Sequence, residues 1–335
     1  MRFVKRRKSG LANRRTKSEY DEVTKATLLG SKSRVQYFDL PIRSVLNRSR
    51  SAYLPFRWTI NPYRGCEFGC KYCYARYTHE FMGMEDPRDF EDKIFAKAGA
   101  GAALREELRG TPRADAIAIG TATDPYQPAE FSYRRTREIL DVFAAEKGRR
   151  LSITTKSCLI ERDLELLRRV ARANVLSVNM TITTLDVGLA RALEPRAPRP
   201  SLRLRTVAAL AEAGIQAGVF SNPILPLITD SRANLDSLAQ AAAAAGARHF
   251  GGGVLFLMPC AQKVFFPFLE ERFPQFASRY RERYERSPYL RGEYCRMIRN
   301  RVDRIRLRHG LSAAAPEYSP ELWEGDEQGT LFPLN

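Results

Sequence analysis

Three of the six cysteines in this 335-residue chain lie close together, in the segment NPYRGCEFGCKYCYAR at positions 61–76. Cys66, Cys70 and Cys73 have the spacing C-x3-C-x2-C. Thiolates are soft ligands that suit zinc and iron–sulfur clusters, so this spacing predicts a metal centre. Gly65 and Gly69 precede two of the cysteines, and glycine there would relieve crowding in a loop that wraps closely around its ligand.

The number of nearby ligands narrows the kind of centre. A structural zinc site takes four protein ligands, and the other cysteines are far away in sequence. His79 is the only nearby histidine, and with it a zinc site stays open as an alternative. A [4Fe–4S] cluster also usually takes four cysteines, so three leave one iron without a protein ligand. An open coordination position is typical of reactive metal sites, and we expect this iron to accept a small molecule with amino and carboxylate groups.

The elements that must position this loop follow a repeated α/β pattern. Segments with helical spacing, at 133–148, 162–174, 201–214 and 232–246, lie between apolar runs typical of strands. Such repetition implies a parallel sheet with right-handed crossovers, either an open sheet or part of a (β/α) barrel. In both, catalytic residues belong at the C-terminal ends of the strands, and the cysteine loop follows the first of them. The six predicted strands are FRWTI (56–60), AIAIG (116–120), LSITT (151–155), VLSVNMTIT (175–183), IQAGVF (215–220) and GVLFL (253–257).

The ends of the chain differ from this core. Residues 1–50 hold fourteen Lys/Arg against four Asp/Glu and few apolar residues, so we expect a basic, flexible arm. Residues 51–260 form the expected α/β domain. Residues 261–335 are expected to form an extension of two or three basic amphipathic helices with an acidic, turn-rich tail.

The formal net charge is +17, which favours a polyanionic partner such as DNA or RNA, although a generally Arg-rich proteome would explain it equally well. The segment RYRERYERSPY (279–289) alternates positive charge with aromatic rings, as nucleic-acid-binding segments do. The chain has no run of about 18 apolar residues and no apolar stretch typical of a signal peptide. We therefore expect a cytoplasmic protein without a membrane span.

The cysteine motif resembles the signature of the radical S-adenosylmethionine (SAM) enzymes, in which an aromatic residue, here Tyr72, precedes the last cysteine. The resemblance covers residues from roughly 50 to 260 and implies a partial (β/α)6 TIM-like barrel, followed here by the C-terminal helical extension. It further implies a [4Fe–4S] cluster on the three cysteines, with SAM on the free iron. An electron donor such as flavodoxin or ferredoxin would reduce the cluster, and cleavage of SAM would give a 5′-deoxyadenosyl radical.

Other stretches resemble one branch, the spore photoproduct lyase-like or DNA repair photolyase-like proteins. These stretches are GTATDPYQPAE, ITTKS, TITTLD, LEPRAPRP and SNPILPLITD, which fall at successive strand ends. Ordinary structural roles stay open for each polar residue in them; for Glu194, that role is an ion pair with Arg196 or Arg199. The resemblance implies that the cofactor is contacted by Tyr72, Thr123, Asp124, Lys156, Thr181, Thr183, Glu194 and Ser221.

The hydrogen-atom donor is where the sequence departs from this branch. In the lyase a tyrosine in the place of Tyr74 is implicated in a hydrogen-atom relay, and a donor cysteine ends the second strand. Here that strand ends in GTATD, with Thr121 or a neighbour in place of the thiol. An O–H bond is a far poorer hydrogen-atom donor than S–H, so the lyase's own splitting of thymine dimers does not carry over directly. Cys158 and Cys260 are the candidate replacement thiols.

Two classes of function therefore remain. The first is a radical SAM enzyme of lyase-like type whose unidentified substrate is a nucleic acid or, alternatively, a protein or peptide docked by the C-terminal helices. The second is a non-catalytic iron–sulfur or zinc protein that binds nucleic acid.

Overall fold

A seven-stranded sheet forms the centre of the computed structural model, which describes residues 25–49, 51 and 54–323. The strand order is β11-β10-β9-β8-β7-β4-β3, and every neighbouring pair is parallel except β3 with β4. Six strands of this sheet, β4 and then β7 to β11, thus lie side by side in chain order. The bounds are β3 Leu46–Arg48, β4 Trp58–Ile60, β7 Ala116–Ile119, β8 Arg150–Thr155, β9 Val175–Thr181, β10 Gln216–Ile224 and β11 His249–Val254.

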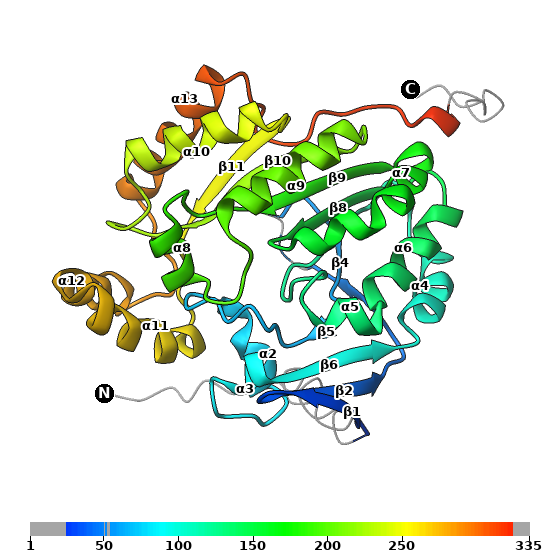
Figure 1. Ribbon diagram of the computed structural model, residues 1–335, viewed down its shortest axis with the longest axis horizontal. Coiled ribbons are helices and arrows are strands. Elements are labelled where there is room, and N and C mark those ends of the chain that lie inside the picture. The colour runs from blue at the N-terminus through cyan, green and yellow to red at the C-terminus, as the bar shows by residue number, and fades with distance from the viewer. Residues whose placement is uncertain (1–24, 50, 52–53, 324–335) are drawn as a thin grey trace, which may run out of the picture.

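The helices that connect these strands lie along one face of the sheet (Figure 1). Right-handed crossovers between strands in sequential order bring every connection to the same side, as in a (β/α) barrel. The connecting helices and turns are α4 Ala100–Leu108, α5 Ala129–Tyr133, α6 Arg135–Ala145, η2 Cys158–Asp163, α7 Leu164–Ala173, α8 Val187–Leu193, α9 Pro200–Glu212 and α10 Arg232–Ala244. The C-terminal ends of the parallel strands therefore share one edge of the sheet.

The predicted elements of the core are confirmed. Each of the six predicted strands overlaps an observed one, although β11 begins and ends several residues earlier than GVLFL. The four predicted helices are α6, α7, α9 and α10, and the last turns of α6, α9 and α10 lie just before Gly148, Gly214 and Gly246.

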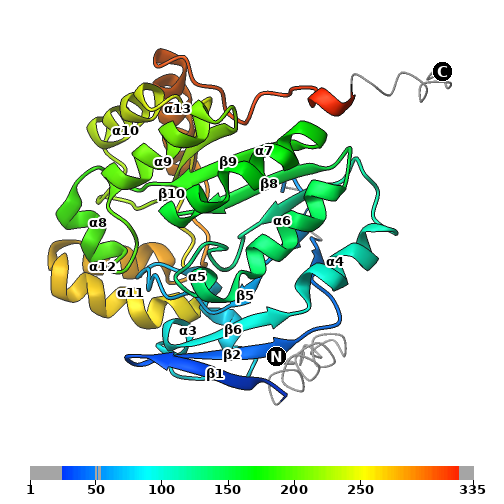
Figure 2. The ribbon, with the colours of Figure 1, turned by 45° about the vertical axis from the view of Figure 1, so that its right-hand side comes forward.

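A second, small sheet corrects the predicted N-terminal arm. Its order is β1-β2-β6-β5, with β1 Thr27–Lys32, β2 Val35–Pro41, β5 Tyr63–Arg64 and β6 Lys93–Ala98. The expectation of a flexible arm is wrong for residues 27–48, because β1, β2 and β3 lie there; residues 1–24 lie outside the described part of the chain. The partner of β2 is β6, more than fifty residues later, so no local pattern announces this pairing (Figure 2).

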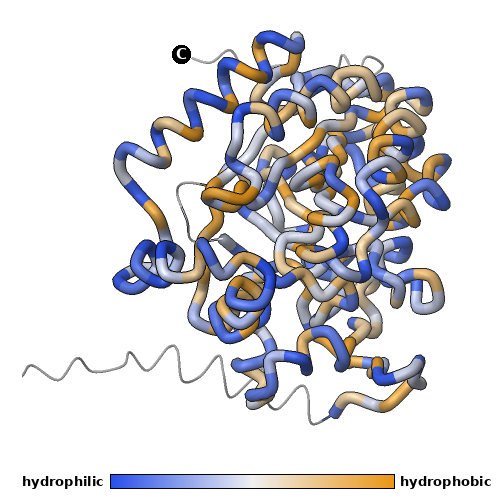
Figure 3. Tube along the Cα trace, turned by 60° about the vertical axis from the view of Figure 1, so that its left-hand side comes forward, coloured by the Kyte–Doolittle hydropathy of each residue, from blue (hydrophilic) through white to orange (hydrophobic). Residues whose placement is uncertain are grey.

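The C-terminal extension packs against the cysteine loop. Two or three helices were predicted for it, and its described part contains three: α11 Pro259–Arg272, α12 Pro274–Tyr284 and α13 Glu293–Arg308. Aromatic and aliphatic residues of α11 and α12, including Phe265 and Tyr284, share one buried cluster with Cys66 and Cys70. The predicted boundary at 260 falls inside α11. Figure 3 shows that hydrophilic residues lie mainly on the outer turns of the helices. Among the described residues, no helix is both long and apolar enough to cross a bilayer.

His249, at the start of β11, fills the space beside Gly218 of β10. A Cβ built on Gly218 of β10 would lie 2.2 Å from its Nε2, so glycine leaves the space that the ring occupies. Nε2 is hydrogen-bonded to Oδ1 of Asn179 on β9, 2.7 Å away. Burial lowers the pKa of His249 from 6.5 to about 4.

This pKa predicts a pH-dependent contribution to stability. Between about pH 6.5 and about pH 4 the unfolded chain protonates His249 while the folded chain does not. Its contribution is therefore complete above pH 6.5 and decreases as the pH falls, by up to about 1.4 kcal/mol per pH unit. Urea unfolding of wild type and His249→Gln at about pH 7.5, 6 and 5 measures the difference in unfolding free energy. We expect the unfolding free energy of His249→Gln to rise relative to that of the wild type as the pH falls. A difference that stays constant with pH would contradict the lowered pKa of His249.

Candidate functional site

The cysteine loop leaves the C-terminal end of β4 and is held by backbone hydrogen bonds on two sides. Cys66 N–H donates to the carbonyl of Phe90, 2.8 Å away, and Lys71 N–H donates to the carbonyl of Leu193, 2.9 Å away. A third bond inside the loop joins Cys73 N–H to the carbonyl of Cys70 at 3.2 Å. The loop is therefore a fixed part of the fold, because segments before β6 and after β9 both hold it.

Gly65 has a backbone conformation that the other residues rarely adopt. Its φ is +81°, and a Cβ there would lie 2.6 Å from the carbonyl oxygen of Lys93 and 3.0 Å from that of Phe90. Gly69 is also left-handed, with φ +65°. The expected use of glycine to relieve crowding beside the cysteines is thus present in the loop.

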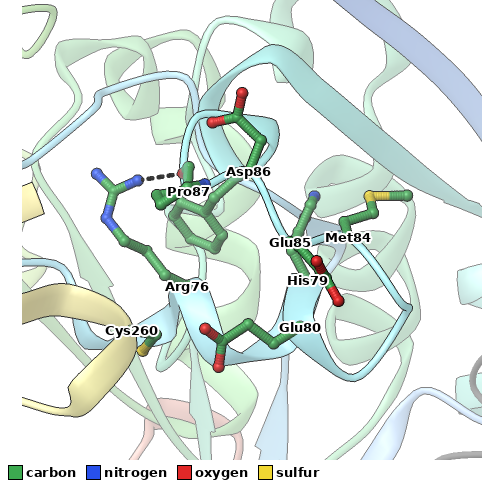
Figure 4. Close-up of a pocket in the computed structure, with 9 residues that line it drawn as sticks. Arg76, His79, Glu80, Met84, Glu85, Asp86, Pro87 and Cys260 are labelled. Carbon is green, nitrogen blue, oxygen red and sulfur yellow. Dashed lines mark hydrogen bonds between the residues drawn. The ribbon is translucent and has the colours of Figure 1, made fainter. Parts of the chain in front are cut away.

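Arg76 anchors the far end of the loop. Its guanidinium donates to Glu91 at 2.6 and 2.9 Å, to the carbonyl of Cys70 at 3.1 Å and to that of Pro87 at 2.7 Å. Arg76 is 2% exposed and also lies over the ring of Phe90. Figure 4 shows its hydrogen bond to Pro87. No spacing rule marks Arg76 in the sequence, because its partners are carbonyls and one acid that only the folded chain brings together.

The three thiols share one partly cationic environment, in which Cys66 and Cys70 are buried and Cys73 is half-buried. Burial is the main cause that raises the pKa of each thiol, and for Cys70 the pKa rises to about 12. Cys70 and Cys73 also raise the pKa of Cys66, and Cys73 raises that of Cys70, whereas Lys156 lowers the pKa of Cys70 and Cys73. The backbone N–H of Asp124 also favours the thiolate of Cys66. Such cations and N–H groups stabilise the thiolate form that a metal requires.

Three cysteine thiolates are a donor set that suits an iron–sulfur cluster. In the described part of the chain, no group of three or more His, Cys, Asp or Glu side chains converges as a site for one metal ion. In a [4Fe–4S] cluster each thiolate binds a different iron, so its ligands need not converge on one point. His79, the fourth ligand of the zinc alternative, instead has Nε2 3.0 Å from the carbonyl of Lys93 and packs edge-on against Phe90. Its Nδ1 is buried without a hydrogen bond, but no group of three or more potential ligands forms around it among the described residues, so the four-ligand zinc site is not assembled there.

A buried ion pair borders the loop. Glu194, in the segment between β9 and α9, accepts a hydrogen bond from the hydroxyl of Tyr72, and its other oxygen lies 2.5 Å from a guanidinium nitrogen of Arg203. The Arg203 guanidinium also donates to the carbonyl of Thr181 at 2.9 Å. The expected alternative of an ion pair with Arg196 or Arg199 is wrong in its partner. Because both carboxylate oxygens of Glu194 are engaged, this geometry favours a positioning role over direct cofactor contact.

The position of Arg203 in the sequence could have identified it as a buried, paired arginine. On α9 it occupies the same stripe as Thr206, Val207 and Leu210, all of which are buried. An arginine on the apolar stripe of a helix is rarely left unpaired when buried, so its position indicates a buried carboxylate partner.

Asp124 and its neighbours fasten two strand ends together. One oxygen of Asp124 accepts a bond from the hydroxyl of Thr155 at 2.6 Å, and the other accepts from the backbone N–H of Lys156 at 2.7 Å. The hydroxyl of Thr123 donates to the carbonyl of Tyr63, 3.1 Å away. The side chains of Asp124 and Thr123 are thus used within the protein, while the ammonium of Lys156 lies 6.0 Å from the ring centroid of Tyr72 and makes no ion pair with any described residue.

Two hydroxyls beyond β9 and within β10 are buried without a partner. Thr183 Oγ1 and Ser221 Oγ have no hydrogen bond among the described residues, although both side chains are at most 1% exposed. Unsatisfied buried hydroxyls are rare because they cost free energy, and a polar ligand would satisfy them. Thr181 contributes its carbonyl to Arg203. Polar groups therefore lie at or near the C-terminal ends of four successive strands, β7 to β10.

The candidate hydrogen donors lie in different places. The hydroxyl of Tyr74 donates to the carbonyl of Thr121, in the stretch GTATD that has no cysteine. Cys260, at the start of α11, has Sγ 3.5 Å from the carbonyl of Tyr74. Figure 4 shows it beside the helix that follows the loop. Cys158 instead lies against Thr206 of α9, so the fold brings Cys260, but not Cys158, to the chain segment of the loop.

Comparison with known proteins gives three findings. Residues 60–239 match the model of the Radical SAM superfamily. The uncharacterized protein Rv2578c of Mycobacterium tuberculosis (strain ATCC 25618 / H37Rv) is 38% identical over 304 residues, which are 89% of this chain and 88% of that protein. The uncharacterized protein MJ0683 of Methanocaldococcus jannaschii is 30% identical over 178 residues, which are 52% of this chain and 62% of that protein.

Among solved structures, spore photoproduct lyase complexed with dinucleoside spore photoproduct is similar with a TM-score of 0.61. It is 15% identical, and the match covers 82% of this chain and 80% of that one. At this identity the similarity concerns the fold, and it confirms the predicted architecture of a partial, TIM-like barrel.

Proposed function

This chain belongs to the radical SAM superfamily, and from that membership we propose that it is an enzyme that holds a [4Fe–4S] cluster on Cys66, Cys70 and Cys73 and cleaves SAM reductively. The observation that carries the proposal is the set of three thiols on one fixed loop at the C-terminal edge of a parallel sheet, with Cys66 and Cys70 buried and Cys73 half-buried. When bound, the cluster and SAM supply a one-electron reduction of the sulfonium that yields a 5′-deoxyadenosyl radical.

Residues around the loop would bind and orient SAM. The ammonium of Lys156 is proposed to pair with the carboxylate of the methionyl group, because it has no ion-pair partner among the described residues. The unpaired hydroxyls of Thr183 and Ser221 would bond the polar groups of the ribose. Asp124 would act mainly by holding the backbone of Lys156 in place, and Tyr72 would close the wall next to the Glu194–Arg203 pair.

From this placement we assign different roles to two parts of the chain. Residues 51–260 are proposed as the SAM-cleaving part, and residues 261–335 as an extension that covers one side of the loop. Because α11 and α12 share a buried cluster with the cysteines, we expect the extension to be required for a stable site. The cluster must receive electrons, so we propose a flavodoxin or ferredoxin as its reductant. We also propose a cytoplasmic location.

The substrate class that we propose is nucleic acid, with the arginine- and aromatic-rich segment 279–289 as support. The solved spore photoproduct lyase with a related fold carries a dinucleoside photoproduct, but the reaction need not be the same. The strand end at Thr121 has no thiol here. Tyr74, whose hydroxyl reaches that strand end, and Cys260, which lies beside the backbone of Tyr74, are the proposed hydrogen donors.

Anaerobic reconstitution tests the proposal. We expect the wild type to bind about four irons per chain and, after reduction with dithionite in the presence of SAM, to release 5′-deoxyadenosine or an adduct of it. Cys70→Ala should lose this release completely, because one iron would lack its ligand. Cys295→Ala, on α13, is the matched control and should retain it.

Two results would count against the proposal. A Cys70→Ala protein that still released 5′-deoxyadenosine would contradict it directly. A wild-type cluster whose spectrum is indifferent to SAM would instead favour the non-catalytic alternative, an iron–sulfur protein that binds nucleic acid.

A further inference from the structure

A stack of aromatic rings leads from the cysteine loop to the protein surface. Tyr74 directly follows Cys73, and its ring centroid lies 4.7 Å from that of Phe256, just beyond β11. Phe256 in turn lies 5.4 Å from Tyr289, with the two rings nearly parallel at 19°. Tyr289 is 50% exposed. The stack therefore ends in an aromatic ring that is half open to solvent.

The exposed ring is held in place by its loop. Leu257 N–H donates to the carbonyl of Pro288 at 2.8 Å, which ties the α12–α13 loop to the segment after β11. Ser287 Oγ donates to the carbonyl of Tyr289 and accepts from its N–H, both at 3.1 Å. Because these bonds fix the backbone of Tyr289 and of the two residues before it, a ligand that stacks on its ring would lose little conformational entropy of the protein.

Arginines flank Tyr289 in the sequence of its loop. Arg286 and Arg291 flank Tyr289 on the same loop, both are exposed, and neither makes an ion pair with a described residue. Residues 281–308 contain ten arginines against four acidic residues. Two other arginines of this segment already have partners: Arg281 pairs with Glu270, and Arg283 lies over the ring of Tyr294. The two free guanidiniums beside an open aromatic face match phosphates beside a base.

We propose that Tyr289 and Phe256, with Arg286 and Arg291, form a base-stacking platform for single-stranded nucleic acid at the rim of the cysteine-loop site. Unpaired bases expose π-faces, and sequence-tolerant binders use stacked aromatics together with cationic side chains in this way. This proposal deepens the proposed function. It rests on that function for the role of the bound strand as substrate, since Tyr74 links the platform to Cys73. Binding itself can be measured without turnover.

Fluorescence anisotropy of a labelled oligothymidylate with the full chain tests the platform. Removal of one stacking ring in Tyr289→Ala should weaken binding by about 5- to 150-fold, whereas Tyr289→Phe should bind within about 2-fold of wild type. Replacing Arg286 and Arg291 with alanine should flatten the dependence of log affinity on log salt concentration by about 1.4, at about 0.7 per phosphate contact. Phe131→Ala, which removes an exposed aromatic of α5, is the matched control and should bind as wild type does.

The outcomes separate this proposal from the proposed function. Binding by Tyr289→Ala equal to that by Phe131→Ala would overturn the platform, even if the wild type cleaves SAM. Tyr289-dependent binding in a protein that cleaves no SAM would leave the platform standing and overturn the enzyme. Tighter Tyr289-dependent binding of an acidic, tyrosine-rich peptide than of the oligonucleotide would assign the surface to a peptide and overturn the nucleic-acid proposal.

Discussion

Arg203→Met is expected to lower the free energy of unfolding by about 3–5 kcal/mol, because it leaves the carboxylate of Glu194 buried without its cation. Both side chains are at most 1% exposed, and their closest approach is 2.5 Å. The same substitution removes the donor to the carbonyl of Thr181, so the end of β9 loses this link to α9. We also expect weaker SAM binding, since Tyr72 depends on Glu194 for its hydrogen bond.

A double-mutant cycle distinguishes the ion pair from general damage to α9. Glu194→Gln combined with Arg203→Met removes both charges, so its cost should be smaller than the sum of the two single costs. Chemical denaturation of the reconstituted proteins gives the three values. Arg205→Met, which alters an exposed arginine on the same helix, should change stability by no more than about 0.5 kcal/mol. Strictly additive costs, or a cost for Arg203→Met as small as that for Arg205→Met, would refute the role of the pair.

Gly65→Ala is expected to prevent stable assembly of the cluster. With φ at +81° the backbone alone costs roughly 1–3 kcal/mol for a residue with a Cβ, and that atom would lie 2.6 Å from the carbonyl oxygen of Lys93. Backbone atoms cannot move aside as a flexible side chain can. The carbonyl of Phe90, 3.0 Å from the same Cβ, also accepts the bond from Cys66 N–H, so relief of the clash would displace a cluster ligand.

Gly99→Ala provides the matched control. Gly99 has a similar φ of +73°, but a Cβ there meets nothing within 4 Å. It therefore carries the backbone cost without the clash. Iron and sulfide analysis after anaerobic reconstitution should give about four irons for Gly99→Ala and less than about one for Gly65→Ala. Equal loading of the two variants would show that the cysteine loop tolerates the added methyl group.

The sequence alone determined the α/β architecture and the three thiols of the proposed metal centre. Both follow from local patterns: each of the six core strands is a short apolar run, and Cys66, Cys70 and Cys73 lie within one loop. Parallel strands in chain order bring their C-terminal ends to one edge, so the position of the loop after the first strand already indicated where chemistry belongs. The resemblance to the radical SAM signature also needed only these few consecutive residues.

The tertiary structure decided the contacts between residues far apart in sequence. Residues 27–48 have no strong strand pattern, and β2 becomes a strand by pairing with β6, which comes more than fifty residues later. Arg203 rather than Arg196 or Arg199 pairs with Glu194, because α9 turns that side chain towards the end of β9. The stack of Tyr74, Phe256 and Tyr289 likewise joins three separate segments. Local propensity constrains each segment by itself, whereas ion pairs, ring stacking and strand partners depend on distances that exist only after the chain has folded.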